Sequence, residues 1–381
     1  MTRPITTMVL VGLLSACGSS SPDGSGAGGS TSSSAGSGGG GQTTGGGGSP
    51  GAGGSSSSSG SGGALPSGDF EARCAAPGVV KCIGFDEEAD FNIGDGGVDG
   101  AYGDNFGIFP PSGTSDYSLA TRDLSTKASG ASSLKFTIPS NAGADSSGSF
   151  FTNFSEDLSV QFGAGSELYV QWRQRFSAEL LANDYAGGGG WKQIIIGAGD
   201  HPGVFETSCT ALETVVQNLQ HRGFPQMYNS CSGSTSHGPY DPFEEPFQGF
   251  DFKLQNARPA PYCLYSQSPD SYFPPSGNCF GYVADEWLTF QVKLEIGPRV
   301  GDEFADSHVT LWIGREGQPP EEVITWGPYG LSAGAASEDL RFGKVWLLPY
   351  NTGRDAGPSY QEAYTWYDEL IVSSQKIADP E

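Results

Sequence analysis

The chain of 381 residues has little positive charge: 19 Lys and Arg stand against 43 Asp and Glu, which leaves a formal net charge of −24. Proteins that bind nucleic acid neutralise phosphates with clustered positive charge, so this balance argues against nucleic acid as a partner. The same balance counts against a polyanionic substrate. Only a local basic patch would attract one, because salt screens charges beyond about 8 to 10 Å.

Several motifs of common enzymes are also absent. The sequence contains no serine-hydrolase elbow, no phosphate-binding loop and no His-Glu-x-x-His motif. No two cysteines have the Cys-x-x-Cys spacing of a zinc site. No window shows a long amphipathic helical pattern, so a helical fold is disfavoured.

The first residues have the order of a bacterial export signal. Arg3 precedes an apolar run over residues 4–14, which is too short to span a bilayer. Leu14-Ser-Ala-Cys17 then resembles a lipobox, whose cysteine becomes the lipid-modified first residue of the mature protein. We expect residues 1–17 to be a lipoprotein signal and Cys17 to hold an exported protein to a membrane of the cell envelope, at the outer membrane or cell surface.

Residues 18–67 consist almost entirely of Gly, Ser, Ala and Thr. Such a composition cannot bury enough apolar surface to fold, so a disordered linker is predicted. A Gly/Ser coil of about 50 residues has a root-mean-square span of roughly 35 to 42 Å. The remaining residues, 68–381, are expected to form one domain, and the protein is expected to be a monomer.

Six cysteines follow the linker. An even number in an exported protein argues for disulfides, although six thiols allow fifteen connectivities. Pairing of sequence neighbours closes three local loops, Cys74–Cys82, Cys209–Cys231 and Cys263–Cys279. We predict these three bonds.

Short strands recur along the domain. Alternation is clearest over 286–296, where Leu288, Phe290 and Val292 share one face. The span 220–282 is rich in Pro and Gly and is predicted to be a long loop at a functional rim. About ten strands with Gly and Pro turns predict a two-sheet sandwich or jelly roll. The other strands are expected at 83–88, 133–138, 150–154, 168–176, 191–197, 212–219, 250–254, 308–313, 322–326, 344–350 and 364–372.

The strands 168–176 and 191–197 are predicted to form a hairpin that carries a polar face. In the first of them Gln171, Arg173 and Arg175 lie on the face opposite Trp172. Two guanidinium groups about 7 Å apart along a strand suit an acidic or hydroxyl-rich ligand. The alternative is a solvated face whose arginines pair with some of the many carboxylates.

The order of these segments resembles the concanavalin A-like jelly rolls of bacterial polysaccharide lyases and related carbohydrate-active proteins. The resemblance covers most of 68–381 and implies an all-β sandwich with one concave sheet that binds an extended polysaccharide. The segments that carry it are Phe85-Asp86, Trp172-Arg-Gln-Arg-Phe176, Trp191-Lys-Gln-Ile194, Glu286-Trp-Leu-Thr-Phe290, Val309-Thr-Leu-Trp312 and Trp366-Tyr-Asp-Glu-Leu-Ile-Val-Ser373.

Two kinds of enzyme occur on this scaffold. Hydrolases of the laminarinase type use a Glu-x-Asp-x-x-Glu motif, which is absent here, so hydrolysis is disfavoured. A lyase that cleaves uronate polymers needs a cation or amide for the substrate carboxylate, a base for the C5 proton and an acid for the leaving oxygen. The Gln-x-His motif of alginate-type lyases is not met, because Ile194 and Ile195 follow Gln193.

We predict β-elimination, with a non-catalytic glycan-binding module or an adhesive envelope lipoprotein of the same fold as the alternatives. The candidates for base and acid are His201, His221, His237, Tyr228, Tyr240, Tyr350 and Tyr360. The predicted catalytic residues are Arg173, Gln193, His201 and Tyr350. The predicted substrate-binding residues are Gln171, Arg175, Lys192, Trp191, Trp346, His237 and Tyr240.

The resemblance also implies a structural calcium ion. Jelly rolls of this kind often tie the first strand to the last through an Asp carboxylate and backbone carbonyls, which are oxygen ligands that calcium prefers. Asp86 and Asp368 occupy the matching positions. The alternative is that Asp368 caps a strand or pairs with a lysine.

Overall fold

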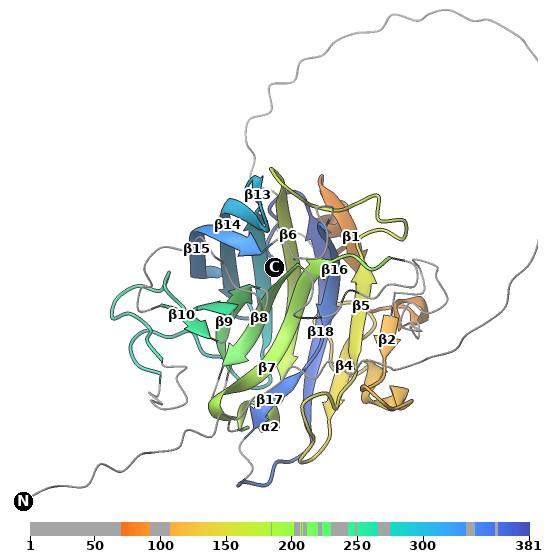
Figure 1. Ribbon diagram of the computed structural model, residues 1–381. Helices are drawn as coiled ribbons and strands as arrows, with labels where there is room; N and C mark the ends of the chain where they lie inside the picture. The colour runs from red at the N-terminus through yellow and green to blue at the C-terminus, as the bar shows by residue number, and fades with distance from the viewer. Residues whose placement is uncertain are drawn as a thin grey trace, which may run out of the picture. The chain divides into compact units, whose positions relative to one another are not determined.

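Two antiparallel β-sheets enclose one large hydrophobic core (Figure 1). The computed structural model describes residues 70–91, 107–183, 185–201, 206, 208, 212–219, 223–229, 243–247, 250–265, 275–332, 340–354 and 357–381. The predicted all-β sandwich of jelly-roll type is therefore confirmed. Cys17 and the linker lie outside the described residues, so the lipid anchor stays a prediction.

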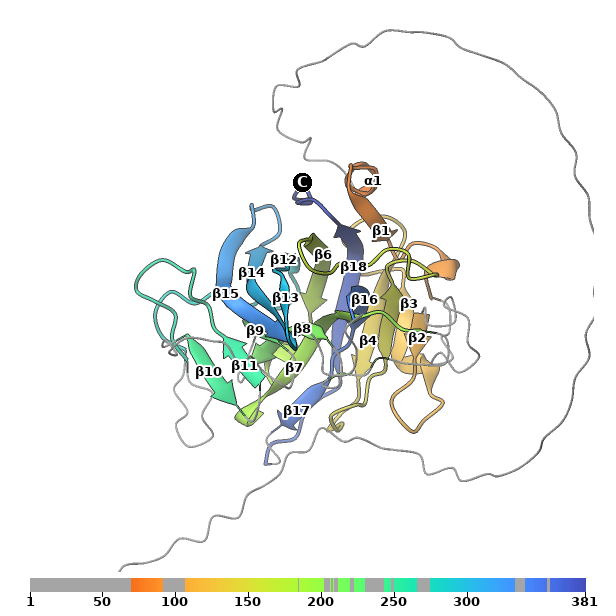
Figure 2. The same cartoon turned by 45° about the horizontal axis from the view of Figure 1, so that its top comes forward.

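The first sheet, called sheet 1, contains the strand with the two arginines. Its order is β13 (Arg299–Val300), β14 (Glu303–Gly314), β12 (Trp287–Glu295), β6 (Glu167–Phe176), β18 (Ala363–Ser373), β4 (Ser133–Ile138) and β3 (Ala120–Asp123). In addition, β15 (Glu321–Ser332) pairs with β14, and β1 (Val79–Ile83) pairs with β18. Figure 2 shows β1 and the short helix α1 (Phe70–Cys74) next to one end of β18.

The second sheet, called sheet 2, contains the Gly-rich strand. Its order is β10 (Glu244–Phe247), β11 (Phe250–Lys253), β9 (Phe224–Asn229), β8 (Glu213–Leu219), β7 (Tyr185–Ala198), β16 (Phe342–Leu347), β5 (Ser149–Asn153) and β2 (Gly107–Phe109). The strand β17 (Asn351–Arg354) pairs with β7. A single helical turn, α2 (Ala178–Leu181), lies between β6 and β7 in sequence, and two 3-10 turns span Glu88–Phe91 and Tyr117–Leu119. No helix among the described residues is long and apolar enough to cross a membrane.

The predicted alternation of β6 is confirmed. Val170, Trp172 and Phe176 are fully buried between the sheets, and the Trp172 and Phe290 ring centroids are 5.0 Å apart. Period two therefore assigns each side chain of β6 to the core or to the outer face. The predicted hairpin is wrong, because β6 belongs to sheet 1 and β7 to sheet 2. The connection through α2 crosses from one sheet to the other.

A β-bulge interrupts β7 between Lys192 and Ile194, where the pairing with β8 shifts register. Ile194 and Ile196 pack in the core, whereas Ile195 packs in a separate cluster on the outer face of sheet 2. The extra residue lets Gln193 and Ile194 both face inward. Lys192 is consequently left on the outer face.

Amide and phenol groups link the two sheets inside the core. The Gln193 side chain donates to Gln174 Oε1 of β6 at 3.0 Å, and its Oε1 accepts from the Tyr282 hydroxyl at 2.7 Å. The Tyr367 hydroxyl of β18 donates to the Gln193 carbonyl at 2.7 Å. Because buried polar groups must be hydrogen-bonded, this network fixes the orientation of Gln193.

Two further expectations need correction. The first strand spans Val79–Ile83 and ends where the sequence predicted it to begin; Phe85, with φ of 54°, turns the chain instead. Within 220–282, β11 confirms the strand predicted at 250–254, whereas β9 and β10 lie where a loop is predicted. Pro225 hides the alternation of β9, because proline is uncommon inside strands.

The cysteine predictions are confirmed for two bonds. Cys74 joins Cys82 with a Cα–Cα distance of 5.8 Å, and Cys263 joins Cys279 with a distance of 4.6 Å. Cys209 and Cys231 lie outside the described residues, so their bond stays a prediction. The first bond fastens α1 to β1, at the end of the chain that follows the linker.

We expect Gln193→Ala to lower the free energy of unfolding by about 1–3 kcal/mol, because it removes the acceptor of the buried Tyr282 hydroxyl and one of the two donors to Gln174 Oε1. Urea unfolding of the variant measures this change. Gln217→Ala is the matched control, since Gln217 is a half-buried glutamine on the outer face of β8, and it should change stability by no more than about 0.5 kcal/mol. Equal effects of the two substitutions would contradict the structural role of Gln193.

Candidate functional site

The outer face of sheet 2 brings together a lysine, a serine and two tyrosines, called here the Lys192 cluster: Lys192, Ser208, Tyr228 and Tyr350. Lys192 Nζ donates to Ser208 Oγ at 2.9 Å. The same nitrogen lies 5.3 Å from the ring centroid of Tyr350 and 5.8 Å from that of Tyr228. These distances are those of cation–π contacts.

The strand pairing explains why these side chains meet. The Lys192 amide donates to the Tyr350 carbonyl at 3.0 Å, which places Tyr350, three residues after β16, beside β7. Lys192 pairs with Gln217 of β8, and β8 in turn pairs with β9, where Tyr228 stands opposite Val215. Lysine and tyrosine thus come from chain segments far apart in sequence.

Aromatic rings extend the outer face away from the Lys192 cluster. Trp346 of β16 is half-buried, and its ring centroid lies 5.9 Å from that of Phe151 on β5. The rings of Phe151 and Phe109 have centroids 3.8 Å apart. Apolar ring faces with a few polar groups among them are the usual lining of a ligand site.

A buried ion pair lies on the same face. Lys344 Nζ contacts Asp200 Oδ1 at 2.5 Å and donates to the Glu206 carbonyl at 2.7 Å, and both side chains of the pair are almost completely buried. Asp200 also accepts from the Glu206 amide at 2.8 Å. Burial raises the pKa of Asp200 and lowers the pKa of Lys344, and the opposite charge of each partner opposes that shift.

This ion pair is tied to the Lys192 cluster through the chain. Glu206 is held by both Lys344 and Asp200, and Ser208 follows it by two residues. The Ser208 hydroxyl lies 3.4 Å from Glu213 Oε1 as well as accepting from Lys192. We infer that the ion pair positions Ser208 over Lys192.

Four residues named from the sequence lie on this face: Lys192, Tyr350, Trp346 and Tyr228. His201 is exposed just beyond the end of β7, where its charge acts on Asp200 and Glu206. His237 and Tyr240 lie outside the described residues. Tyr228 is among the sequence candidates for proton transfer, but the strand that positions it is not predicted.

Two predicted site residues of β7 belong to the core instead. Trp191 is 1% exposed and packs against Phe176, with ring centroids 6.1 Å apart. Gln193 is fully buried in the network with Gln174. The bulge explains both positions, because it turns the two neighbours of Lys192 inward.

The predicted residues of β6 lie on the outer face of sheet 1, so the core separates them from Lys192. Arg173 is 3.8 Å from Glu369 Oε1, and Arg175 is 3.2 Å from Asp285 Oδ1. Gln171 accepts from Arg73 Nη1 at 2.6 Å. The prediction of a single polar face that joins the two strands is therefore wrong. The arginines pair with carboxylates as in the alternative, but Gln171 and Arg173 are buried, so the face is not solvated there.

The two predicted calcium ligands contact one loop, residues 127–132. Asp368 Oδ2 accepts from the Ala128 amide at 2.8 Å, and Asp86 Oδ1 accepts from the Ala131 and Ser132 amides. Gly130 lies between these contacts with φ of +60°, and a Cβ there would collide with the Asp86 carboxylate. The loop is thus held from both sides by acidic side chains.

The donor set fits a hard cation in part. Asp368 is fully buried, and burial raises its pKa to about 8, since no basic side chain is among the groups that act on it. A cation would compensate that buried charge, and amide donors to metal-bound carboxylates are common around metal sites. No group of three or more metal-binding side chains occurs among the described residues, so backbone carbonyls would have to supply the other ligands.

Comparison with known proteins finds likeness in structure only. The sequence matches no protein-family model, and no curated protein is significantly similar. The PL-14 alginate lyase from Aplysia kurodai is 10% identical with a TM-score of 0.44, covering 70% of this chain and 89% of that one. The endo-β-1,4-glucuronan lyase from Trichoderma reesei is 14% identical with a TM-score of 0.38, covering 69% and 90%.

A third solved structure, the alginate lyase vAL-1 from Chlorella virus, is 13% identical with a TM-score of 0.38, covering 71% of this chain and 94% of that one. Structural neighbours of this chain thus include polysaccharide lyases. The likeness is too distant to assign an activity to this chain.

We expect Lys344→Met to lower the free energy of unfolding by about 3–5 kcal/mol, because it leaves the Asp200 carboxylate buried without its partner. The double variant Lys344→Met, Asp200→Asn should be destabilised by less than the sum of the two single variants, since the two side chains interact directly. Denaturant unfolding of the three variants measures both quantities.

Lys293→Met is the matched control, because Lys293 pairs with the more exposed Glu167 and Glu295, each at 3.0 Å. Its expected cost is about 0–1 kcal/mol. A Lys344→Met effect no larger than this, or strict additivity of the two changes, would contradict the buried ion pair.

Proposed function

We propose that the outer face of sheet 2 binds an acidic polysaccharide and cleaves it by β-elimination. The observation that carries this proposal is the Lys192 cluster, in which one ammonium group and two phenols lie within contact distance. These are the groups that the reaction needs: a cation for the uronate carboxylate and two side chains that can transfer protons.

The cation acts on the carboxylate of the sugar that loses its C5 proton. As that proton leaves, negative charge spreads onto the carboxylate, and a nearby ammonium group stabilises it. Lys192 is the residue proposed for this function. Arg173, which the sequence predicts here, is held on the other sheet by Glu369 and cannot take part.

The two tyrosines are proposed as base and acid. One phenolate takes the proton from C5, and the electron pair of the C5–H bond forms the C4=C5 double bond. The C4–O bond breaks, its electron pair goes to the leaving oxygen, and the second phenol protonates that oxygen. No water is consumed, so the reaction balances with substrate and side chains alone.

The aromatic side chains beside the cluster would hold the flanking sugars. Trp346 presents a half-buried ring on β16, one strand away from Lys192 on β7. A sugar ring has one relatively apolar face that can lie on such a ring, while its hydroxyls stay in water. The site would therefore bind several consecutive sugars along sheet 2.

Three substitutions test the proposal: Lys192→Gln, Tyr228→Phe and Tyr350→Phe. Each should lower the rate of cleavage by roughly 100-fold or more, the usual cost of losing a proton-transfer group or a charge-stabilising donor. The protein is incubated with alginate, polyglucuronate, polygalacturonate and neutral glucans. Ultraviolet absorbance follows the conjugated double bond, and a separate assay follows new reducing ends.

Two variants on sheet 1 are matched controls. Tyr364→Phe removes the hydroxyl of a tyrosine on β18, and Arg175→Gln removes a cation of β6 that pairs with Asp285. Both should retain full activity. New reducing ends without the double bond would indicate a hydrolase, and binding without cleavage would indicate a glycan-binding module. Either result would contradict β-elimination.

We also propose that Asp368 and Asp86 hold a structural calcium ion. Binding to the folded state alone stabilises a protein, by about 2.7 kcal/mol at a ligand concentration 100 times the dissociation constant. A chelator should therefore lower the melting temperature, and Asp368→Asn should abolish this response. Asp123→Asn, at a carboxylate that accepts from the Ser125 amide, should preserve it. A melting temperature that is the same with and without the chelator would contradict the calcium site.

A further inference from the structure

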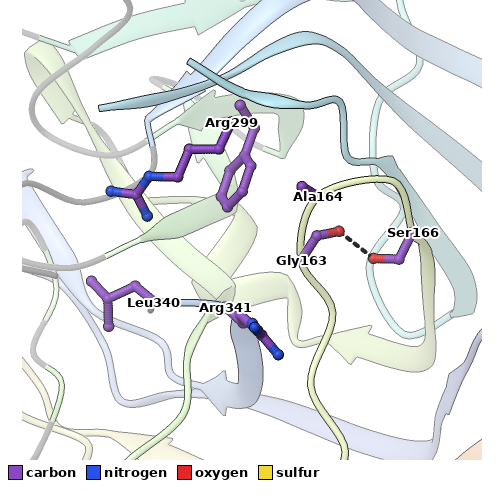
Figure 3. A pocket seen from close by; sticks show the side chains of 7 residues that line it. Gly163, Ala164, Ser166, Arg299, Leu340 and Arg341 are labelled. Atoms are coloured by element: carbon purple, nitrogen blue, oxygen red, sulfur yellow. Dashed lines mark hydrogen bonds between the residues drawn. The ribbon is translucent and has the colours of Figure 1, made fainter. Parts of the chain in front are cut away.

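The contact between Lys344 and Asp200 joins an amine and a carboxyl group that are both shielded from bulk water. The Lys344 side chain is 2% exposed and that of Asp200 is 0% exposed, and Nζ lies 2.5 Å from Oδ1. The chain enters β16 beside the cavity drawn in Figure 3, which Leu340 and Arg341 line, but Lys344 is not among the residues of that cavity. Amine and carboxyl group are therefore held together where solvent does not compete with them.

Asp200 is fixed on both sides of its backbone by one asparagine. Its amide donates to Asn153 Oδ1 at 2.9 Å, and Asn153 Nδ2 donates to the Asp200 carbonyl at 2.9 Å. The preceding residue, Gly199, packs directly on β16, because a Cβ there would lie 3.5 Å from Gly343 Cα. The Asp200 carboxyl group can thus move away from Lys344 only if these contacts break.

A bulge in β16 turns the lysine toward that carboxyl group. The pairing with β7 shifts register between Phe342 and Lys344, so that Phe342 packs in the core while Lys344 lies on the outer face. There Lys344 Nζ lies 5.7 Å from the ring centroids of both Phe151 and Trp346. The amine is therefore surrounded by apolar surface in place of its usual hydration.

Burial changes the proton affinity of the two groups in opposite directions. It lowers the pKa of Lys344 and raises the pKa of Asp200, although the charge of each partner opposes the shift. Both shifts favour an uncharged amine beside an uncharged acid. An uncharged amine is a nucleophile, and an uncharged carboxyl group can be attacked at its carbon atom, so burial favours the reactive form of the pair.

The two carboxyl oxygens of Asp200 have different surroundings. Oδ1 accepts from the Glu206 amide at 2.8 Å, and such a donor stabilises negative charge on that oxygen during an attack on Cγ. Oδ2 is buried and accepts no hydrogen bond from any residue that the structure describes. Oδ1 is therefore the oxygen that would stay, and Oδ2 the oxygen that would leave.

A second buried acid can carry protons between the amine and the leaving oxygen. Lys344 of β16 and Glu213 of β8 both pair with Gly197 of β7, which has no side chain to separate them. Glu213 is 2% exposed, and its negative charge acts on Lys344. A carboxylate in this position can take a proton from the amine and pass it on.

We propose that Lys344 and Asp200 condense to an amide bond that cross-links β16 to the segment after β7. Nζ attacks Cγ, the new N–C bond forms, and the bond between Cγ and Oδ2 breaks. Of the three protons of the ammonium group, one stays on the amide nitrogen and two leave with Oδ2 as one molecule of water. Contact in a fixed geometry replaces an activating reagent, so no oxidant or cofactor is needed.

The contact described above is the state before this reaction. The N–H that remains after it can still donate to the Glu206 carbonyl, so the position of Ser208 is kept. The cross-link therefore does not depend on the proposed lyase activity.

Peptide mapping of the full chain tests the proposal. After reduction and digestion with trypsin, residues 193–222 and 342–354 should appear as one branched peptide, whose mass is the sum of the two less one water. The same bond should prevent cleavage after Lys344. Lys293 is the matched control in the same digest, because it contacts two more exposed carboxylates at 3.0 Å each; it should remain unmodified and be cleaved.

Two variants distinguish the covalent bond from an ion pair. Lys344→Arg keeps the positive charge beside Asp200 but should give no branched peptide, because a guanidinium group stays protonated. Glu213→Gln should slow cross-linking roughly 100-fold, the usual cost of losing a proton-transfer group. The share of branched peptide in chain sampled at intervals after synthesis measures this rate, and Glu167→Gln, the same change on sheet 1, should leave it unaltered.

The digest of the unmodified chain needs no variant to fold. Complete cleavage after Lys344 in that digest would overturn the proposal. A branched peptide that joins Lys344 to a residue other than Asp200 would also overturn it, and so would an unchanged rate in Glu213→Gln, because the reaction as written passes its protons through Glu213.

Discussion

The hydrogen bond between Gln193 and Gln174 joins the two sheets inside the core, and the orientation of the candidate site depends on it. An amide in this position must be satisfied, so Gln193 has to face sheet 1. The bulge of β7 then turns Lys192 outward and lets Ile194 enter the core. A slip of one residue would instead bury the ammonium group among aromatic rings, at the high cost of desolvating an unpaired charge.

A second buried polar group acts on the same site from the outer face. The ion pair of Lys344 and Asp200 is fully enclosed, and such pairs often add little net stability, because the desolvation of both charges is costly. Its role is easier to explain by what it holds: the Glu206 carbonyl and amide, two residues before the serine that contacts Lys192. Core and surface networks thus converge on one ammonium group from opposite sides.

The sequence predicts single strands of this fold well and predicts their assembly poorly. Period two identifies which side chains of β6 are buried, because the alternation is a local property of one strand. It cannot tell that Arg173 and Lys192 belong to different sheets, since both read as outward-facing cations on neighbouring strands. The position of Tyr228 is not predicted for another reason. Pro225 interrupts the alternation of β9, and only the pairing with β8 shows that this segment is a strand. The pairing of Asp86 with Asp368 follows only from the resemblance, and the structure adds the loop that both carboxylates contact.

Net charge is also a poor guide to where this molecule can meet an anion. The arginines of β6 are neutralised at contact distance by Glu369 and Asp285, so the face that looks basic in the sequence is electrically close to balanced. Lys192 lies where the strand order, and not the composition, places it. A field of 24 excess negative charges acts over long distances, but in physiological salt it decays within about 8 Å, whereas a guanidinium or ammonium group binds a carboxylate at about 3 Å. Repulsion would therefore slow the approach of an acidic ligand, while its short-range contacts would decide whether it stays bound.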